Sequence, residues 1–353
     1  MWPYYVMIAI PYGLSLIFLR RRYEDNGFAR KLTISVFFAI FITVLALRDV
    51  TCGTDLVRYE LKFAESAQTG WTDLWRSGTD VGFYLFQKAV RTLTADFGIF
   101  LGMVSILSLG GIWFFYGRES ESAPLTIALF VTVAPFTMYF SGLRQILAMA
   151  FVIPAWYCAK HKKWGWFLLT VLLTFLFHRS GIVIALLYPL YRIRISYKWI
   201  YALVPAFVLV LLFNKPIFRF LMVLAGEEEY PMSDTGAYAV LALLVLLAIY
   251  AFVIPDEDQL DADTCALRNL LILSVFLQCF APVHTLAMRV NYYFLLFIPV
   301  LIPKIARRAK PVWRFAAQVS VMVMVVFFTI LFFMQGHLGD DDLNVFPYVF
   351  RYA

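Results

Sequence analysis

Residues 97–116, FGIFLGMVSILSLGGIWFFY, decide the class of this protein, because they run for 20 residues without a charged side chain. An α-helix of that length crosses about 30 Å of hydrocarbon. Comparable apolar runs recur along the chain, in which 62% of the 353 residues are hydrophobic and only 15% are charged. Such a composition requires lipid as the solvent. We therefore expect an all-α, polytopic integral membrane protein whose residues 1–353 form a single transmembrane domain.

Short basic loops between the apolar runs set the expected topology, at Arg20–Arg22 with Arg30–Lys31, at 160–163, at 192–198 and at 304–314. The positive-inside rule places these loops in the cytosol, and the acidic loop 256–263 then falls on the same side. About 10–12 spans of membrane-crossing length are expected, at 3–19, 32–47, 97–116, 124–140, 143–159, 165–178, 181–191, 199–213, 237–254, 267–283, 290–303 and 314–335. Short spans such as 181–191 and 290–303 predict broken or tilted helices packed inside the bundle.

Two longer segments fall on the outward side of this topology. Residues 48–96 contain tryptophans and tyrosines that predict amphipathic helices in the membrane interface, and residues 214–236 form a second outward loop. The scattered cysteines contain no C-x-x-C pair, so we expect no disulfide framework, no zinc site and no cofactor. The net charge of +7 lies mostly in the basic loops, so nucleic acid is not an expected partner.

Each outward turn carries an arginine at or beside the end of a span: Arg48, Arg144, Arg179 and Arg289. An arginine at membrane depth costs about 2.5–3.5 kcal/mol on insertion scales, so its presence indicates a partner or a ligand. A guanidinium is a planar fork that suits phosphate oxygens, and several around one cavity favour a diphosphate. The alternative for any one arginine is snorkelling to the interface or pairing with Asp49, Asp55 or Asp80.

Two of the outward turns have a local sequence pattern that predicts their structure. Residues 141–145, SGLRQ, interrupt two apolar runs, so we expect a tight turn that opens a helix, whose N-terminal amides favour an anion. Residues 48–59 leave the second span with alternating acids and bases, and Gly53–Asp55 is typical of a turn followed by an N-cap. Asp55 is therefore either a helix cap or a catalytic carboxylate.

Histidine marks the two other turns. Residues 178–181, HRSG, place an imidazole, a guanidinium and a hydroxyl within one turn between two apolar runs. A histidine there either accepts the proton of a sugar hydroxyl or only hydrogen-bonds a phosphate. In the last turn His284 and Arg289 precede Tyr292, whose ring suits sugar stacking or anchoring at the interface.

Four short patches thus share an outward placement and follow one another in order along most of the chain: Arg48-Asp49 with Gly53-Thr54-Asp55 and Tyr59, Arg144-Gln145, His178 with Ser180, and Arg289 with Tyr292. In these patches the chain resembles the EpsG/Wzy-type polymerases of bacterial exopolysaccharide and O-antigen synthesis. Where the resemblance leads us to look for a glutamate ahead of Gly82-Phe83, this sequence has Asp80.

The resemblance implies a glycosyltransferase of the GT-C type in the bacterial cytoplasmic (inner) membrane, with helices enclosing a cavity that faces the periplasm. Such an enzyme transfers a growing glycan from undecaprenyl diphosphate to a sugar hydroxyl of a lipid-linked repeat unit. The implied partners are the undecaprenyl-diphosphate-linked oligosaccharide and the lipid bilayer, with a chain-length regulator and a flippase beside them.

Residue roles follow from this chemistry. We expect Arg144, Arg179 and Arg289 to bind the diphosphate, and either His178 or Asp55 to activate the acceptor hydroxyl. Further substrate contacts are expected from Arg48, Asp49, Tyr59, Gln145, Ser180 and Tyr292. Arginines stabilise the developing negative charge without a metal, and the outward loops contain no D-x-D-like motif apart from the tail run Asp340–Asp342. We therefore expect a metal-independent enzyme.

Three other functions remain open at the level of sequence. A transporter or flippase for lipid-linked oligosaccharide needs polar residues deep in its spans, whereas the strong polar groups here gather at one side. A ligase uses the same donor but passes the glycan to a different lipid. An acyltransferase that acts on cell-surface glycans also carries outward histidine and arginine.

Overall fold

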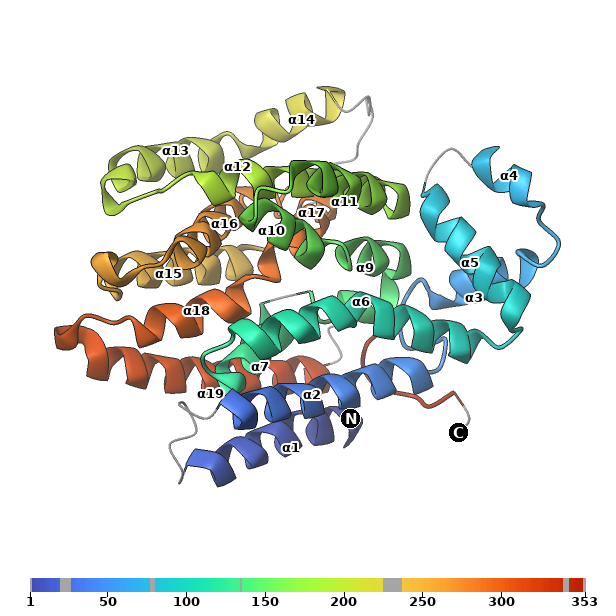
Figure 1. Ribbon diagram of the computed structural model, residues 1–353, viewed down its shortest axis with the longest axis horizontal. Helices are drawn as coiled ribbons and strands as arrows, with labels where there is room; N and C mark the ends of the chain where they lie inside the picture. The colour runs from blue at the N-terminus through green and yellow to red at the C-terminus, as the bar shows by residue number, and fades with distance from the viewer. Residues whose placement is uncertain are drawn as a thin grey trace.

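The computed structural model describes residues 2–19, 27–76, 80–133, 135–224, 237–338 and 343–351, which fold into a bundle of helices (Figure 1). The α-helices are α1 (Trp2–Leu19), α2 (Gly27–Leu47), α3 (Leu56–Glu65), α4 (Trp71–Arg76), α5 (Val81–Leu93), α6 (Phe97–Glu119), α7 (Ala123–Thr132), α8 (Met138–Ser141), α9 (Leu143–Met149), α10 (Val152–Lys160), α11 (Trp164–Phe177), α12 (Leu187–Arg192), α13 (Ile200–Leu212), α14 (Asn214–Leu224), α15 (Tyr238–Val253), α16 (Ala262–Gln278), α17 (Thr285–Leu295), α18 (Ile298–Arg307) and α19 (Arg314–Leu338). Short 3-10 helices lie at Arg179–Leu186 (η2), Tyr197–Trp199 (η3), Glu257–Gln259 (η4) and Pro311–Trp313 (η5). Within the described ranges no β-strand forms, so the expected all-α class is confirmed. Arg20–Arg22 and the tail run Asp340–Asp342 lie outside these ranges.

Three segments of the described chain are long and apolar enough to cross a membrane, namely α2, α6 and residues 311–334, which include most of α19. The number rises to five if each of two bent helix pairs counts as one span. The first pair joins Arg179–Arg192 to Tyr197–Leu212 with a bend of 120°, and the second joins α17 to α18 with a bend of 50°. The break predicted within 290–303 is therefore confirmed, and 181–191 begins as a 3-10 helix.

The predicted spans 124–140 and 143–159 are also divided. Helix α7 ends at Thr132, shortly before Pro135, which lacks a backbone N–H and disfavours helix in the residue before it. The short helices α8 and α9 then lie on either side of Gly142. Irregular backbone at membrane depth is tolerated where protein covers it, and residues 138–143 are all buried.

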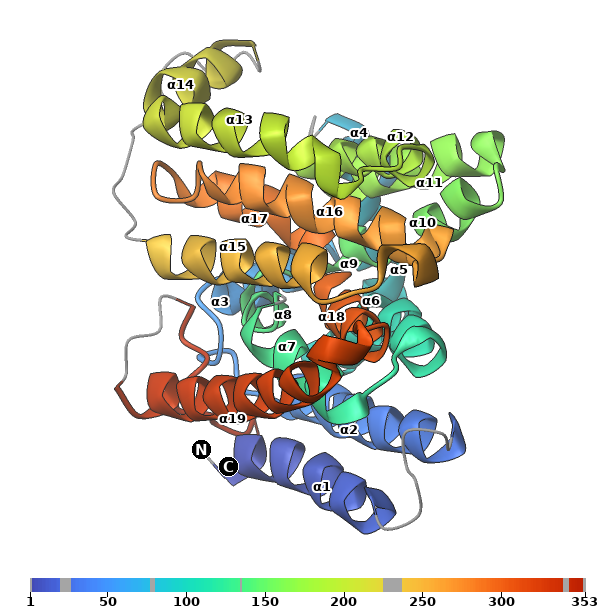
Figure 2. The ribbon, with the colours of Figure 1, turned by 90° about the vertical axis from the view of Figure 1, so that its left-hand side faces the viewer.

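Apolar side chains cover much of the outside of the bundle. Leu168 and Leu172 on α11 are each 53% exposed, and α13 has no buried side chain. Figure 2 shows the helices stacked in rows, from α14 and α13 at the top to α1 at the bottom. Apolar faces of this extent are unfavourable in water, so they contact lipid, and the protein is a multi-pass membrane protein.

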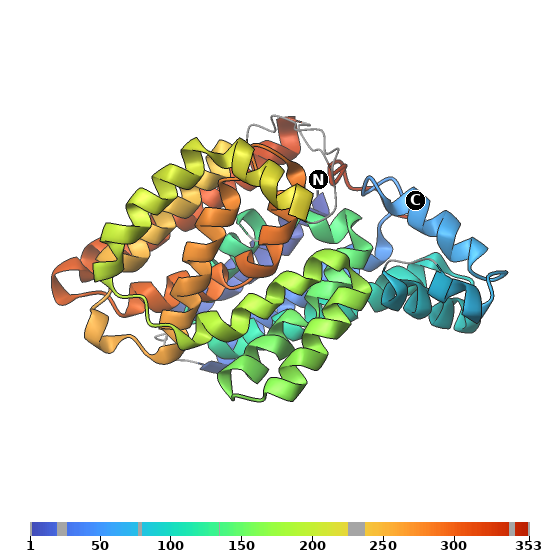
Figure 3. The same ribbon diagram turned by 90° about the horizontal axis from the view of Figure 1, so that it is seen from above.

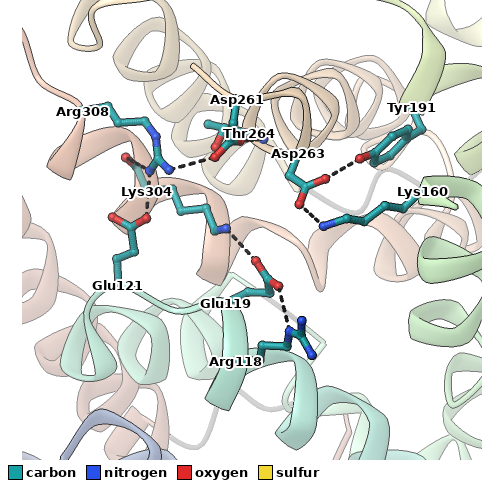
Figure 4. Close-up of polar contacts among 10 residues, drawn as sticks. All are labelled: Arg118, Glu119, Glu121, Lys160, Tyr191, Asp261, Asp263, Thr264, Lys304 and Arg308. Atoms are coloured by element: carbon teal, nitrogen blue, oxygen red, sulfur yellow. Dashed lines mark hydrogen bonds and ion pairs between the residues drawn. The ribbon is translucent and has the colours of Figure 1, made fainter. Parts of the chain in front are cut away.

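The basic loops gather at one end of the bundle, called the basic end below, where acidic side chains meet them (Figure 4). Asp263 accepts a hydrogen bond from Lys160, although the two residues are 103 positions apart. Arg308 donates a hydrogen bond of 2.9 Å to Asp261. The acidic loop 256–263 therefore lies at the same end as the basic loops, as the topology predicted.

An ion pair between buried Arg268 and partly exposed Glu257 holds this acidic loop against α16. The Arg268 side chain has no exposed surface, and its guanidinium donates hydrogen bonds of 2.8 and 2.7 Å to the two carboxylate oxygens of Glu257. A third hydrogen bond of 2.7 Å reaches the Ile195 carbonyl, and the Phe252 ring centroid lies 4.4 Å from the guanidinium carbon. A buried charge is tolerated only when it is paired and hydrogen-bonded in this way.

Helices α3, α4 and α5 lie at the opposite end of the bundle, and they project from it as the blue-to-teal segment in Figure 3. Helix α3 buries Leu56 and Phe63, while α5 buries Phe83 and Val90. The charged residues of α3 stay nearer the surface, whereas α5 also buries Gln87 and Lys88. The amphipathic helices predicted within 48–96 are therefore present.

The second predicted loop is helical in its first part. Residues 214–224 form α14, whose Phe218 and Met222 pack in a small apolar core with Phe280 and Val283. The rest of the predicted loop, including the acidic run before Tyr230, lies outside the described residues.

An extended segment at residues 343–351, called the C-terminal strap below, crosses the turn that follows α2. The Asp49 amide donates a hydrogen bond of 2.9 Å to the Val349 carbonyl. The Thr54 amide donates one of 3.1 Å to the Leu343 carbonyl. The strap therefore holds the first of the four polar turns in place.

Candidate functional site

The carboxylate of Asp80 is the centre of a polar cluster at the end of the bundle opposite the basic end. Arg144 donates a hydrogen bond of 2.6 Å from Nη1 to Oδ2, and the Arg179 amide donates one of 3.2 Å to Oδ1. Nδ1 of His178 lies 3.5 Å from Oδ1, which is an electrostatic contact rather than a short hydrogen bond. Asp80 therefore brings the second and third predicted turns together.

Asp80 adopts an unusual backbone conformation to make these contacts. It occupies the N-cap position of α5 with a φ of 55°, and its side chain makes no capping hydrogen bond. The left-handed region is uncommon for residues other than glycine, and it persists only where surrounding interactions hold it. The ion pair with Arg144 is the interaction that supplies this restraint.

The charge of Asp80 is stabilised although its side chain is only 5% exposed. Burial alone raises the pKa of the Asp80 carboxyl, but the contacts with His178 and Arg144 and the Arg179 amide lower this pKa below its ordinary value. The carboxylate is therefore ionised at neutral pH and pairs with a guanidinium that stays charged.

Arg144 is held at two points and remains partly open. Its Nε donates a hydrogen bond of 3.2 Å to the Tyr59 hydroxyl, in addition to the bond to Asp80. Its side chain is 37% exposed. A guanidinium has five N–H donors, so these two contacts orient the group and leave donors for a ligand.

The turn before Arg144 is the one that the sequence predicted. Gly142 separates α8 from α9, and a Cβ at this position would lie 1.9 Å from Cε of Met138. Only glycine fits this close approach without a shift of Met138. The tight turn places Arg144 in the first turn of α9.

Ser141 links this turn to the first polar turn of the chain. Its hydroxyl oxygen lies 2.8 Å from the Thr54 hydroxyl, accepts a hydrogen bond of 3.2 Å from the Asp55 amide, and lies 3.4 Å from Oδ2 of Asp55. Asp55 precedes α3 but its side chain makes no capping bond. Gly53 has a φ of 136°, and a Cβ there would lie 2.1 Å from the Phe140 carbonyl oxygen.

The fourth turn joins the others through two contacts. Gln145 donates a hydrogen bond of 2.6 Å to the Arg289 carbonyl, and the Ser180 and Tyr293 hydroxyl oxygens lie 3.2 Å apart. The side chains of Arg179 and Arg289 are exposed and form no ion pair within the described part of the chain. The starts of α9, η2 and α17 therefore meet, with two arginines unpaired.

Two predicted site residues lie apart from the Asp80 cluster. Arg48 is 1% exposed; it donates a hydrogen bond of 2.6 Å to the Leu45 carbonyl, and its guanidinium carbon lies 5.7 Å from the centroid of the Phe140 ring. Asp49 accepts hydrogen bonds from the amide and the hydroxyl of Thr51, at 3.0 and 2.8 Å. Both residues shape the turn beneath the C-terminal strap.

The tyrosine and histidine of the fourth turn have structural contacts. Tyr292 is 7% exposed, so its ring packs inside the bundle. His284 is the N-cap of α17, where Nδ1 accepts a hydrogen bond of 2.9 Å from the Leu286 amide, and its ring stacks on Phe218. Tyr293, which follows the predicted Tyr292, is the residue that reaches Ser180.

Asp80 and Ser141 are the two residues whose importance the sequence pattern understated. Asp80 stood out only as a possible counter-ion for arginine and as the acid ahead of Gly82-Phe83. Ser141 was simply part of the predicted turn. Both roles depend on contacts between segments more than 60 positions apart, which no local pattern reveals.

A bundle of apolar helices that gathers arginine, histidine and carboxylate groups at one end defines a polytopic membrane protein with a charged site for a polar ligand. A family model described as the EpsG family matches residues 31–350, and the chain belongs to the EpsG family. The match includes all the predicted site residues and confirms the resemblance inferred from the four patches. Membership supports a polysaccharide polymerase-type role at the level of the family. No curated protein and no solved structure matches the chain.

Proposed function

We propose that this protein polymerises lipid-linked oligosaccharide repeat units at the outer face of the bacterial cytoplasmic membrane, with a GT-C-like architecture. It transfers a glycan from undecaprenyl diphosphate to a hydroxyl of an acceptor sugar. The observation that carries this proposal is the meeting of Arg144, Arg179 and Arg289 around Asp80 and Gln145, from three separate parts of the sequence.

The charges of this cluster favour a diphosphate. Asp80 offsets the charge of Arg144, whereas Arg179 and Arg289 have no acidic partner among the described residues. Two exposed and unpaired guanidinium groups attract a dianionic group and offer bidentate hydrogen bonds to its oxygens. Arg179 and Arg289 therefore provide most of the attraction, and Arg144 adds an oriented donor.

The reaction needs one base and one stabilised leaving group. The acceptor hydroxyl oxygen forms a bond to the anomeric carbon of the donor, while the bond from that carbon to the phosphate oxygen breaks and its electron pair leaves with the lipid diphosphate. His178 accepts the hydroxyl proton, and Asp80 stabilises the resulting imidazolium through Nδ1. Asp55 is the alternative base, because its carboxylate adjoins Ser141 on the other side of Arg144.

In the proposed reaction, arginine side chains stabilise the leaving diphosphate, which is a role that a divalent cation has in many transferases. The negative charge that develops on the leaving diphosphate is stabilised by guanidinium groups, of which Arg144 is already oriented by Asp80 and Tyr59. We propose metal independence for this reason. Polymerisation in the presence of EDTA is expected to match the untreated rate, and a loss that added Mg²⁺ or Mn²⁺ restores would contradict it.

The products of a reconstituted reaction test the proposal against its rivals. Purified protein in vesicles is given a purified undecaprenyl-diphosphate-linked repeat unit. Longer lipid-linked products are expected. Movement of the substrate across the membrane without lengthening would indicate a flippase, and transfer to another lipid would indicate a ligase; either result without lengthening overturns the proposal. A chain-length regulator and a partner flippase would change the length or supply of product in this assay.

A further inference from the structure

A cavity of about 610 Å³ lies between α2 and α6 at the basic end of the bundle, away from the Asp80 cluster. Its lining combines two cationic side chains, Lys31 and Arg118, with the aromatic rings of Trp113 and Phe114. None of these residues has a part in the proposed transfer reaction. The combination of a charged mouth with an apolar wall is the pattern of a site for an amphiphile.

Glycine leaves the α6 wall of this cavity open. A Cβ at Gly110 or at Gly117 would meet no heavy atom within 4 Å. The two glycines are separated by two helical turns on one face of α6, which is about 10 Å along the axis. They form a smooth slot along the helix that suits an extended acyl chain.

One hydrogen bond joins the two walls of the cavity. Trp113 on α6 donates a hydrogen bond of 2.9 Å from Nε1 to the Ser35 hydroxyl on α2. The indole is 38% exposed, and tryptophan is enriched at the level of lipid headgroups. This bond therefore links α2 to α6 beside the cavity.

The mouth of the cavity carries a net positive charge. Lys31 is exposed and forms no ion pair with any residue that the structure describes. The side chain of Arg118 is 64% exposed and lies 3.7 Å from Glu119. The second carboxylate oxygen of Glu119 already accepts a hydrogen bond of 2.7 Å from Lys304 (Figure 4). Exposed pairs as long as that of Arg118 are weak, so both cations remain available to an anion.

We propose that this cavity binds an anionic phospholipid, with one acyl chain along the slot of Gly110 and Gly117 and the phosphate group between Lys31 and Arg118. Lipid tails outside the cavity are as apolar as its wall, so the acyl chain alone gives little selectivity. Selectivity comes from the headgroup, to which each cation contributes about a fivefold preference. The occupant is therefore an anionic rather than a zwitterionic lipid.

Bound lipid is measured by native mass spectrometry after the protein is taken from vesicles with equal amounts of phosphatidylglycerol and phosphatidylcholine. The unmodified protein is expected to retain phosphatidylglycerol in preference. Lys31→Gln with Arg118→Gln is expected to reduce that preference by about 25-fold, because the two charges act nearly independently. The matched control is Lys163→Gln with Lys198→Gln, which removes two exposed charges from loops at the basic end and is expected to leave the preference unchanged.

A second variant tests the cavity itself without a change in charge. Gly110→Leu fills the slot, and its Cβ enters open space, so thermal unfolding in detergent is expected to stay at the unmodified temperature while lipid retention falls. Equal retention by Gly110→Leu and the unmodified protein would overturn the proposal. So would an equal loss in the control pair, which would indicate diffuse attraction. A dimer that Gly110→Leu abolishes, without bound lipid in the unmodified protein, would assign the cavity to a second copy of the chain.

Discussion

Arg144 and Asp80, which are 64 positions apart in the sequence, are joined by a hydrogen bond of 2.6 Å at the end of the bundle that also holds His178. The pair has two effects. It restrains a guanidinium that otherwise has several rotatable bonds, and it removes one positive charge from a cluster that would repel itself.

Asp80→Asn removes the negative charge that faces both Arg144 and His178, while asparagine has nearly the same size and also tolerates a left-handed φ. We expect the rate of chain extension in vesicles to fall at least about tenfold, since Arg144 is held less firmly and the imidazolium of His178 loses its counter-charge. The free energy of unfolding should change by no more than about 1 kcal/mol, because Arg144 is partly exposed. Asp73→Asn in the nearby helix α4 is the control. An unchanged rate for Asp80→Asn would contradict the positioning role.

Arg179→Ala and Arg289→Ala remove the two unpaired guanidinium groups. Each is expected to raise the KM for the lipid-linked donor at least about tenfold, as the loss of a charge-assisted hydrogen bond does. The lysine variants should recover part of the loss, because they restore the charge but not the fork. Arg219→Ala, at an exposed arginine of α14, should leave KM unchanged. If the control and the two site variants behave alike, these arginines do not form the donor site.

His178→Gln tests the identity of the base. We expect kcat to fall by about 100-fold or more with little change in the KM for the donor, which is typical of a lost general base. Asp55→Asn is expected to have the smaller effect on kcat. The reverse order would assign proton transfer to Asp55. Because the lowered pKa of Asp80 keeps its carboxyl ionised near neutral pH, a change of rate between pH 5 and 8 should not come from Asp80.

The ion pair between buried Arg268 and partly exposed Glu257 makes stability depend on pH. Hydrogen bonds from Arg268 lower the pKa of Glu257 below its ordinary 4.5. A depressed folded-state pKa gives stability that is complete above the unfolded value and is lost as pH falls through the folded value. The unfolding temperature in detergent should therefore fall as pH is lowered below about 4.5.

Arg268→Met should weaken this dependence on pH, because Glu257 then loses its partner. Glu257 loses its hydrogen bonds and the Ile195 carbonyl loses its donor, so the variant should also unfold at a lower temperature at neutral pH. Arg219→Met, at an exposed arginine of α14, is the matched control. The same acid sensitivity in Arg268→Met as in the unmodified protein would show that the pair is not its source.

Tyr348 in the C-terminal strap donates a hydrogen bond of 2.8 Å to the Val44 carbonyl near the end of α2. Tyr348→Phe should lower the free energy of unfolding by about 1 kcal/mol, since a buried carbonyl loses its donor. Tyr201→Phe, at a tyrosine that is 86% exposed, should have no effect. Equal unfolding temperatures for both variants would mean that the strap is not firmly bound.

Local patterns predicted the helices and the polar turns, because a long apolar run and an interruption such as SGLRQ are properties of neighbouring residues. They did not predict which turns would touch. Asp80 precedes a helix and so looks like a cap, and only the packing of α5 against α11 turns its carboxylate toward Arg144.

Arg48 shows a second limit of local patterns. It follows a span in the same way as Arg144 does, and the sequence alone does not distinguish the two. In the structure its guanidinium is enclosed by Phe140 and by residues that arrive from the far end of the chain. Burial of this kind depends on contacts across the whole sequence, and an exposed and a buried arginine have the same local signature.

The C-terminal strap also has a consequence for biogenesis. Val44 and Tyr348 are in contact although 304 positions separate them. The turn that bears Asp55 therefore lacks its backbone partners while nearly all of the intervening helices are synthesised and inserted. Contacts of such long range form late. A partly inserted chain therefore lacks the contacts that hold its first polar turn until residues 343–351 have been synthesised.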